Sequence, residues 1–493
     1  MVRTVVGEET HLSSFEAQLS QSGLSAQVGL VIGKITTGSD RGAVYGLVPT
    51  PLNDNGEPAS LISSGRDDKK RNLKQPKSQQ ESSSLLIDSD WVAEHARQVS
   101  KMLLGGIHVV GVYVWVGESL FKCSSLLLWL TVKAVAAVAP ICGGVNLEER
   151  ILLHMSYSPR RWSCRSCLLG SNFSSTSLRL CDFKLSKIVS GLQTFRCNYS
   201  FEIRLPIFAE DMVDSLNFRD VLTRGISCHA QHLKNAKALV DGNLVTGDQL
   251  SASGNPHEIE LLLPFLEDNS MEACSTKEVA GLLVLYGSIY ASGHLGPKEP
   301  VSQAVSDIKG DIITSLRSRL DIICDEAEQY SGSNSEGGGS PFDGKSSSNS
   351  LNPLFLHEWR QPSNLPFPRR VLFPWIEGIF ICDYLQPSES FEDVKVHGKE
   401  LMSMEDEINP SDILEVEIKG PTLAMRPFWD VVSCNSLAEL EERRRKSKDV
   451  SSTGTGGQRV TNHSNLNLLA ALAILLLAIL IGVGMILSGP KSI

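Results

Sequence analysis

The segment VVGVYVWVGES, from Val109 to Ser119, combines β-branched and aromatic residues and ends in a Gly-Glu-Ser turn. This composition is typical of a buried strand. The preceding stretch, DSDWVAEHARQVSKMLL, has apolar residues at helical spacing, and Asp88 or Asp90 is the expected N-cap. The Gly105-Gly106 pair ends this helix, and ESLFKCSSLLLWLTVKAVAAVA predicts a second helix after the strand. This part of the fold is therefore expected to run helix, strand, helix.

A β-hairpin is expected nearer the N-terminus. Val28 to Ile35 forms its first apolar strand, TTGSDRG has the composition of a turn, and Ala43 to Val48 forms the returning strand. Residues 1–150 therefore predict an α/β domain. Residues 53–84 are rich in Ser, Lys, Asp and Pro and poor in apolar side chains, so they predict a disordered, solvated insertion in that domain.

The apolar run from Leu126 to Val145 has two interpretations. It is long enough to cross a membrane and carries only Lys133 as a charge. A buried amphipathic helix is favoured, because Glu118 and Lys122 join Lys133 in interrupting the wider region.

Residues 151–330 predict a second α/β region. HEIELLLPFLED and KEVAGLLVLYGSIYASGHL have the composition of strands. The clearest helical pattern of the chain follows Pro300, in VSQAVSDIKGDIITSLRSRLDIICDEAEQY. Its apolar residues recur every three or four positions and form one stripe, made of Val305, Ile308, Ile312, Leu316, Leu320 and Ile323. The second region therefore ends in a long amphipathic helix.

The rest of the chain divides by composition. Residues 331–350, SGSNSEGGGSPFDGKSSSNS, predict a flexible linker. Residues 351–435 contain LPFPRRVLFPWIEGIFICDYL and predict a small β-rich unit that packs on the cytosolic domain. Residues 436–467 are polar and basic and predict a tether before the apolar run 468–487.

The run LLAALAILLLAILIGVGMIL, Leu468 to Leu487, contains no charge. At about 1.5 Å per residue it crosses a hydrocarbon core of about 30 Å. The basic cluster from Arg443 to Lys448 outnumbers Lys491 on the far side, and the positive-inside rule places such a cluster in the cytosol. We therefore expect one transmembrane anchor with the bulk of the chain cytosolic, and a buried core helix is the alternative. Met1 to Gly7 shows no apolar run of a signal peptide.

Composition restricts the classes of function. The net charge of -10 argues against a general nucleic-acid binder, which needs a basic face. The 11 cysteines are an odd number scattered along 493 residues, so a disulfide framework is not expected. The hydrophobic content of 42% is enough for a sizeable core.

Two short motifs contain metal-binding residue types. CRSC, Cys164 to Cys167, is a lone CxxC motif, and Cys181 and Cys197 do not supply the second close pair that a zinc ribbon requires. Reduced thiols on a loop are the expected interpretation. HAQH, His229 to His232, has no acidic or cysteine companion at ligand spacing, and a surface helix explains it.

GLVIGK, Gly29 to Lys34, is one residue short of a phosphate-binding P-loop and is followed by Ile35 where that loop has Ser or Thr. It is expected to belong to the hairpin. His108 has no partner at ligand spacing and is expected to be a packed or surface histidine.

The strand VVGVYVWVG resembles the MPN-fold strand that ends in a histidine-serine-histidine-proline motif in metal-dependent isopeptidases. With the Val-Val-Gly stems aligned, Val114 and Val116 replace the two histidines and Gly117 replaces the proline. Catalytic zinc needs three protein ligands and an open position for water, and valine has no donor atom. We therefore predict no catalytic, cofactor-binding or metal-binding residues, and the predicted fold class is α+β with an MPN-like domain.

Several segments together resemble the Odr-four-like (odorant response abnormal protein four) family. They are VGLVIGK, GGIHVVGVYVW, AVSDIKGDIITSLRSRLDIICDEAE, LPFPRRVLFPWIEGIFICDYLQPSES and the C-terminal apolar run, in the family's order and over most of the chain. The Arg317/Arg319 and Arg369-Arg370 pairs match the family's pattern without an assigned role. Solvated faces or local salt bridges are the expected explanation for them.

The resemblance implies a non-enzymatic factor of the endoplasmic reticulum membrane. Such a factor helps multi-pass membrane proteins, notably G-protein-coupled receptors, to fold or to leave that membrane. It also implies a ubiquitin-fold-modifier-specific protease as a partner, through pairing of MPN-like domains. A membrane-tethered hydrolase or isopeptidase with an unrecognised site is the alternative, and a structural subunit of a larger membrane complex is a third interpretation.

Overall fold

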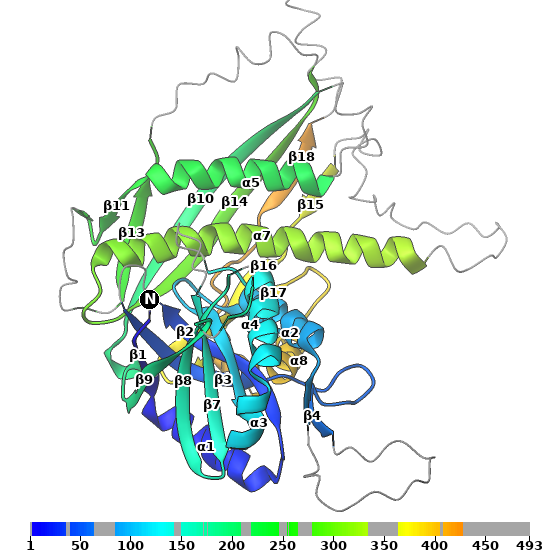
Figure 1. The fold of residues 1–493 in the computed structure, drawn as a ribbon. Helices are drawn as coiled ribbons and strands as arrows, with labels where there is room; N and C mark the ends of the chain where they lie inside the picture. Colours follow the sequence, from blue (N-terminus) through cyan, green and yellow to red (C-terminus); the bar gives the residue numbers. More distant parts are fainter. Residues whose placement is uncertain are drawn as a thin grey trace, which may run out of the picture. The chain divides into compact units, whose positions relative to one another are not determined.

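A computed structural model describes residues 2–426 except 36–39, 64–83, 142–148, 171, 175, 209–217, 246–253, 255, 265–278, 334–362 and 405–407. These residues belong to one unit, Met1–Val431. The expected tether 436–467 and the expected membrane anchor 468–487 lie outside the described residues. The described part has a mixed α/β fold in which a closed β-barrel accompanies an open seven-stranded sheet (Figure 1).

The barrel takes its strands from both sides of residue 150. Their order around it is β1-β3-β2-β6-β7-β8-β9. They are β1 (Thr4–Glu8), β2 (Gln27–Ile35), β3 (Arg41–Pro49), β6 (His108–Trp115), β7 (Glu149–Tyr157), β8 (Arg160–Leu168) and β9 (Leu178–Ser186). β1 closes the barrel by pairing in parallel with both β3 and β9. The domain boundary expected at residue 150 therefore falls inside the barrel, because β7 to β9 are needed to complete it.

The predicted hairpin is confirmed, since β2 and β3 pair antiparallel from Gly29↔Pro49 to Ile35↔Gly42. The disordered insertion expected at 53–84 is wrong for residues 53–63 and for Ser84, which have a defined conformation. The Asn53 carboxamide accepts hydrogen bonds from the backbone N–H groups of Asn55 and Glu57, at 3.0 and 2.9 Å, and this fixes a turn. β4 (Ser60–Ser63) then pairs with β5 (Ser84–Ile87). Residues 64–83 lie outside the described residues.

The described residues before β7 contain the helices α1 (Glu9–Ser22), α2 (Ser89–Met102), α3 (Glu118–Cys123) and α4 (Ser125–Val138). Asp88 caps α2 by accepting a hydrogen bond from the Trp91 N–H at 3.0 Å, as predicted. The single helix predicted after Gly117 is wrong, because the chain leaves helical geometry at Ser124. No helix in the described ranges is long and apolar enough to cross a membrane.

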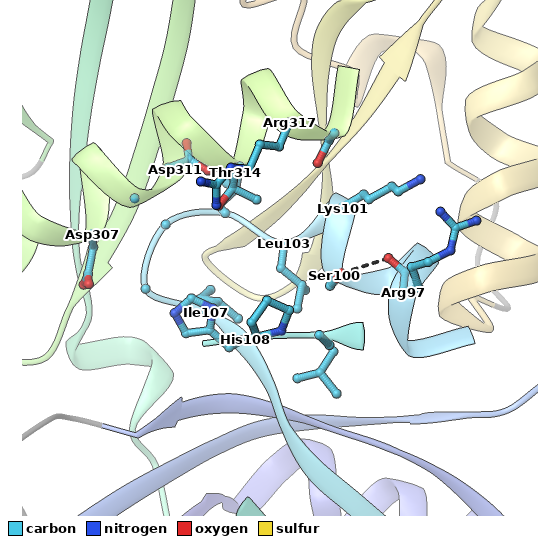
Figure 2. A pocket seen from close by; sticks show the side chains of 18 of the residues that line it. Arg97, Ser100, Lys101, Leu103, Ile107, His108, Asp307, Asp311, Thr314 and Arg317 are labelled. Atoms are coloured by element: carbon cyan, nitrogen blue, oxygen red, sulfur yellow. Dashed lines mark hydrogen bonds between the residues drawn. The ribbon is translucent and has the colours of Figure 1, made fainter. Parts of the chain in front are cut away.

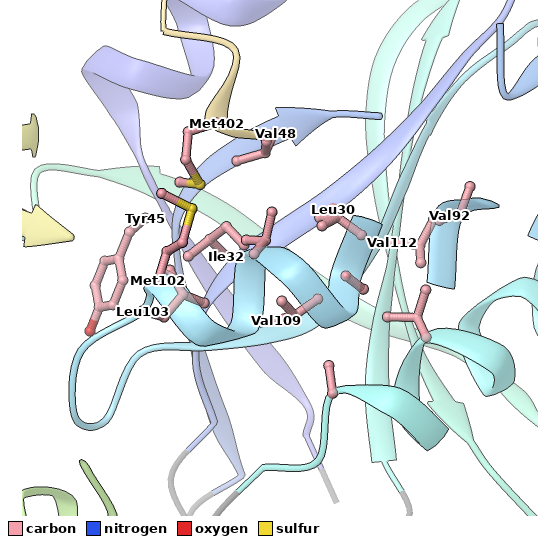
Figure 3. Close-up of a cluster of buried hydrophobic side chains, with 14 of the residues drawn as sticks. Leu30, Ile32, Tyr45, Val48, Val92, Met102, Leu103, Val109, Val112 and Met402 are labelled. Carbon is pink, nitrogen blue, oxygen red and sulfur yellow. The ribbon is translucent and has the colours of Figure 1, made fainter. Parts of the chain in front are cut away.

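The main core lies between the barrel and α2 and α4. Figure 3 shows Leu30 of β2 and Val109 and Val112 of β6 packed with Val92 and Met102 of α2. All five side chains are almost fully buried. The α4 helix reinforces this core, since the Trp129 indole N–H donates to the Leu168 carbonyl at 2.9 Å.

The open sheet has the order β12-β11-β13-β10-β14-β18-β15. Its strands are β10 (Gln193–Phe208), β11 (Lys237–Val240), β12 (Asn243–Leu244), β13 (His257–Leu262), β14 (Val279–Leu295), β15 (Ser363–Pro366) and β18 (Thr422–Arg426). The helices α5 (Phe218–Asn235) and α7 (Val301–Ser333) lie across its long strands (Figure 1). A second hydrophobic core lies between this sheet and the two helices. The predicted apolar stripe of α7 is confirmed, because all six of its residues are buried in this second core. The flexible linker expected at 331–350 is wrong for residues 331–333, which belong to α7, and 334–350 lie outside the described residues.

The small β-rich unit expected at 351–435 is wrong for its described residues, 363–404 and 408–426, which do not form a unit of their own. β15 and β18 join the open sheet, whereas β16 (Arg369–Ile376) and β17 (Ile379–Leu385) form a hairpin. Phe373 and Ile381 of that hairpin are buried in the barrel's main core, together with Val394 of α8 (Phe391–Met402). Residues 363–426 therefore link the barrel to the sheet.

Short 3-10 turns occur at Val189–Gly191 and Pro410–Asp412.

One edge of β14 is buried and, among the described residues, has no neighbouring strand along most of its C-terminal half. Its backbone groups are paired instead with charged side chains. The Tyr290 N–H donates to Glu417 at 2.9 Å, and the Tyr290 carbonyl accepts from the Arg370 guanidinium at 3.1 Å. The Ser292 N–H donates to Asp311 at 3.1 Å.

Two further groups pair with this edge from the barrel side. Gly105 donates to the Ser292 carbonyl at 2.9 Å, and Lys34 donates to the His294 carbonyl at 3.2 Å. The Lys34 ammonium also pairs with Asp307 at 2.8 Å and Glu299 at 3.0 Å. Lys34 is thus a structural cation at the end of β2.

Gly105 and Gly106 allow the barrel to approach α7 closely. A Cβ atom on Gly105 would lie 2.8 Å from the backbone oxygens of Asp307 and Ser292. Gly106 has a φ of +82°, and its Cβ would lie 2.5 Å from the Asp307 carboxylate. Both positions therefore require glycine.

The charged side chains along this edge also pair with one another. Arg370 makes two hydrogen bonds to the Asp311 carboxylate, at 2.7 and 2.9 Å, and Arg319 pairs with Glu417. Both guanidinium groups lie against the Tyr384 ring, at 5.1 and 5.7 Å from its centre. Arg319 and Arg370 are completely buried, so the expectation of solvated or local surface pairs is wrong for them.

We expect Asp311→Asn to lower the free energy of unfolding by about 3–5 kcal/mol, because it leaves the Arg370 charge buried without a carboxylate. Denaturant unfolding of the detergent-solubilised chain, followed by tryptophan fluorescence, measures the change. Glu415→Gln is the matched control: its partner Arg369 is the neighbour of Arg370, but Glu415 is about half exposed. The control should lose less than about 1 kcal/mol. Equal losses in the two variants would contradict a structural role for the buried pair.

Candidate functional site

The two positions where the sequence comparison placed metal ligands are filled with core side chains. Val114 and Val116 have no exposed surface and pack in the main core. Val114 lies on β6, between the antiparallel strand β2 and the parallel strand β7, and its partner on β7 is His154. The strand is therefore buried on both sides and carries packing residues at these positions.

His154 is the residue that sequence reasoning missed. It has no exposed surface and stacks on the Phe121 ring at 3.8 Å, with 3° between the planes. Its Nε2 lies 3.0 Å from the Val116 carbonyl oxygen and its Nδ1 lies 3.2 Å from Ser163 Oγ. A carbonyl only accepts, so Nε2 carries the hydrogen and Nδ1 accepts from the Ser163 hydroxyl. The signal in the sequence is one polar residue inside the apolar run ILLHM, Ile151 to Met155.

The pairing of Ser163 and His154 has the form of a nucleophile beside a base. Burial, opposed by the hydrogen bond to Val116, lowers the pKa of His154, so the ring is neutral at neutral pH. A nucleophile also needs an adjacent space for the reacting atom. Ser163 lines neither the cleft between α2 and α7 nor the cavity on the face of the open sheet. Both ring nitrogens are already hydrogen-bonded, so His154 offers no free donor to a metal.

The CxxC motif lies on strand β8, so the expectation of a loop is wrong. Cys164 and Cys167 are both fully buried, and they belong to different cores. Residues three apart on a strand point to opposite faces, so the two thiols cannot hold one metal. Cys164 is instead opposite Cys181 on β9. Within the described residues no group of three His, Cys, Asp or Glu side chains is placed to hold a metal ion.

The remaining sequence candidates also have structural roles. His229 lies on the buried face of α5, with its Nε2 3.0 Å from the Tyr199 hydroxyl, so an exposed position on a surface helix does not account for it. Burial lowers the pKa of His229 to about 4. Gly29 to Lys34 lie within β2, which confirms that they belong to the hairpin.

A cleft of about 210 Å³ separates α2 and the end of α4 from α7 (Figure 2). Its floor is the loop from Leu103 to His108, which was expected only to end a helix. The pKa of His108 is lowered by burial and by the nearby charges of Lys34 and Arg150, so this histidine is packed and uncharged.

Three cations line one part of this cleft. Arg97 pairs with Glu94 at 2.9 Å and with Asp325 at 3.4 Å. Lys101 is largely buried, and its closest carboxylate, Asp325, is 3.7 Å away. Burial and the charge of Arg97 lower the pKa of Lys101. Arg317 is exposed and makes no ion pair within the described ranges. The three cations would attract an anion. The cleft is small, however, and Asp307, Asp311 and Asp321 also line it, so its residues do not indicate a particular ligand.

Comparisons with known proteins relate the chain to one family. The model of the ODR4-like family, described as odorant response abnormal 4-like, matches residues 29–413. The mouse protein odr-4 homolog is 24% identical over 97% of this chain and 98% of its own length. The human homolog is 24% identical over 84% of this chain and 86% of its own. The Dictyostelium discoideum homolog is 25% identical over 74% and 73%.

Among solved structures, a crystal structure of UfSP from C. elegans is similar with a TM-score of 0.36 and 8% identity. The alignment covers 84% of this chain and 60% of that chain. At so low a TM-score the likeness supports no statement about fold or function.

His154 and His397 should give opposite pH dependences of stability. The pKa of His154 is lowered from 6.5, so the unfolded chain binds this proton first and stability falls as pH drops below 6.5. The hydrogen bond of His397 to Asp383, 2.9 Å long, raises the pKa of His397. Its contribution is present below 6.5 and is lost as pH rises through the raised value.

We therefore expect His154→Gln to reduce the loss of stability between about pH 7.5 and about pH 5, and His397→Gln to increase it. Denaturant midpoints measured across this range test both variants. Parallel curves for the wild type and both variants would contradict the described environments.

Proposed function

Because the chain belongs to the ODR4-like family, we propose that it is a non-enzymatic, membrane-anchored adaptor of the endoplasmic reticulum. It would aid the folding, localisation or trafficking of multi-pass membrane proteins such as G-protein-coupled receptors. It would also recruit a ubiquitin-fold-modifier-specific protease to the reticulum. The bulk of the chain would lie in the cytosol, and no nucleic acid takes part.

The observation that carries the non-enzymatic role is the burial of Val114 and Val116. In an MPN-like domain these positions would hold the ligands of a catalytic metal. Here they pack in the main core, and the nearest imidazole, His154, is occupied at both nitrogens. A domain that keeps strand β6 without metal ligands can still present its surface to other proteins. We therefore favour binding over catalysis as its function. The MPN-like character of the barrel is itself part of the proposal.

The apolar run from Leu468 to Leu487 supports the membrane anchor. The exposed face of α4 supports a protein or membrane contact close to it. Leu126 and Leu130 are each about half exposed on that face, and Phe173 packs beside it on Trp129 at 5.6 Å. The helix is apolar almost all round, which is unusual for one whose face meets water. Such patches commonly bind partners.

The alternative is a membrane-tethered hydrolase or isopeptidase. The hydrogen bond of Ser163 to His154 is the observation that favours it. Reaction with a fluorophosphonate probe separates the two functions, because an activated serine is labelled and a hydroxyl that only donates to a packed ring is not. Labelling of the wild type that disappears in Ser163→Ala would favour the hydrolase. Zinc that stays bound after mild chelation would favour the isopeptidase.

We expect affinity purification of the intact chain from detergent to recover membrane proteins of the reticulum or a modifier protease. A chain that ends at Asp449 should lose the membrane proteins, because it lacks the apolar run. Recovery of only soluble cytosolic enzymes by both chains would contradict the adaptor role.

The double substitution Leu126→Ser and Leu130→Ser should reduce partner recovery several-fold while changing stability little, because both side chains already meet water. Leu180→Ser is the matched control, since Leu180 is 76% exposed on β9. The same purification, quantified by mass spectrometry, compares the variants. Unchanged recovery by the double variant would exclude α4 as the contact.

A further inference from the structure

A second cavity, of about 470 Å³, lies on one face of the open sheet. Its volume is in the range of small-molecule sites. The floor is formed by five polar residues of β10 and β14: Thr194, Arg196, Tyr290, Ser292 and His294. The apolar wall comes from the β16–β17 hairpin and the segments near it, through Leu104, Leu372, Phe380 and Val416.

Strand register places the polar groups on the same face. Thr194 is opposite His294 and Arg196 is opposite Ser292. Residues that are directly opposite, or two apart on one strand, point to the same side of a sheet. Tyr290 is two residues from Ser292 and therefore lies on that side too. The alternate residues, among them Phe195 and Ala291, are buried in the core beneath α7.

His294 has an unused acceptor in this cavity. Its side chain is 3% exposed, and Nδ1 has no hydrogen-bond partner in the part of the chain that the structure describes. The ring is held by a hydrogen bond to the backbone of Gly378, and burial, followed by the charge of Lys34, lowers the pKa of His294 to about 4. The neutral ring donates to a carbonyl through Nε2, so Nδ1 is an acceptor. A buried acceptor without a protein partner is available to a ligand that donates a hydrogen bond.

Arg196 and Tyr290 provide unused donors beside it. Neither the Arg196 guanidinium nor the Tyr290 hydroxyl has a hydrogen-bond partner within the described ranges. The positive charge of Arg196 acts on Tyr290, lowering the pKa that burial raises. Glu415 is the acidic residue at the cavity, and its carboxylate is already paired with Arg369. The cavity therefore presents one unpaired cation, one neutral donor and one neutral acceptor.

We propose that this cavity binds the carboxylate end of an apolar N-acylated amino acid, either as the C-terminal residue of a peptide or as a free molecule. The carboxylate pairs with Arg196, which suits it geometrically, and accepts from the Tyr290 hydroxyl. The amide N–H donates to His294 Nδ1. The apolar side chain packs against Leu372 and Phe380. This proposal is independent of the adaptor role, because it rests on the cavity alone.

Calorimetric titration of the full detergent-solubilised chain with N-acetyl-leucine and N-acetyl-leucinamide tests the assignment. We expect the carboxylate probe to bind roughly ten- to a hundredfold more tightly than the amide, because the charge-assisted contact with Arg196 is lost in the amide. Equal binding of the two probes, or no heat with either, as a cavity that holds water alone would give, overturns the proposal.

Variants assign the contacts. Arg196→Gln should remove the preference for the carboxylate probe, and Tyr290→Phe should weaken its binding several-fold. Arg204→Gln is the matched control, because Arg204 lies on the same strand and face but outside the cavity. It should leave binding unchanged. Binding that survives Arg196→Gln at wild-type strength overturns the site.

His294→Leu should weaken both probes equally, since both carry the amide N–H. Thermal unfolding of this variant shows whether the buried site still folds, and Tyr290→Phe serves as the readout if it does not. A tripeptide that ends in leucine separates the two sources. Tighter binding of the tripeptide than of N-acetyl-leucine assigns a peptide terminus, and the reverse order assigns a free molecule.

Discussion

The buried edge of β14 constrains the rest of the fold, because other parts of the chain must supply hydrogen-bond partners for its backbone groups. A strand edge normally pairs with another strand or with water, because an unpaired amide in the interior is strongly unfavourable. Along Tyr290 to His294 the described residues supply no neighbouring strand. Glu417, Arg370 and Asp311 pair with this edge from one side, and Gly105 and Lys34 pair with it from the barrel. The charged side chains thus satisfy the backbone and one another, and the barrel is joined to the sheet through polar contacts whose geometry is fixed.

That junction gives the chain two neighbouring cavities with different chemistry. Leu104 lines both of them, since the loop that follows α2 passes between the barrel and the sheet. The cleft under α7 is lined by residues of both charges, and most of them pair with charged side chains outside its lining. The cavity on the sheet face keeps donors and an acceptor unused. In contrast, Val114 on β6 is fully buried, and its partner on β7, His154, is stacked on Phe121.

The sequence predicted the structural features that are determined by residues close together in the chain. The β2–β3 hairpin and the apolar stripe of α7 are local patterns, and both are confirmed. It could not predict the boundary at the end of β9, because barrel closure pairs β1 with a strand far along the chain. The roles of Arg319 and Arg370 were missed for the same reason, since Glu417 and Asp311 lie far from them in sequence. The alternation of strand β8 would have separated Cys164 from Cys167, had that strand been recognised.

Gly105 and Gly106 determine how thick the joint between barrel and sheet can be. Only hydrogen atoms stand between their α-carbons and the oxygens of Asp307 and Ser292. A methyl group at either position would act as a wedge and would lengthen the contacts of Lys34 and Gly105 with β14 together. The distance between the barrel and the sheet therefore depends on these two glycines, because the joint has no room for a Cβ atom at either position.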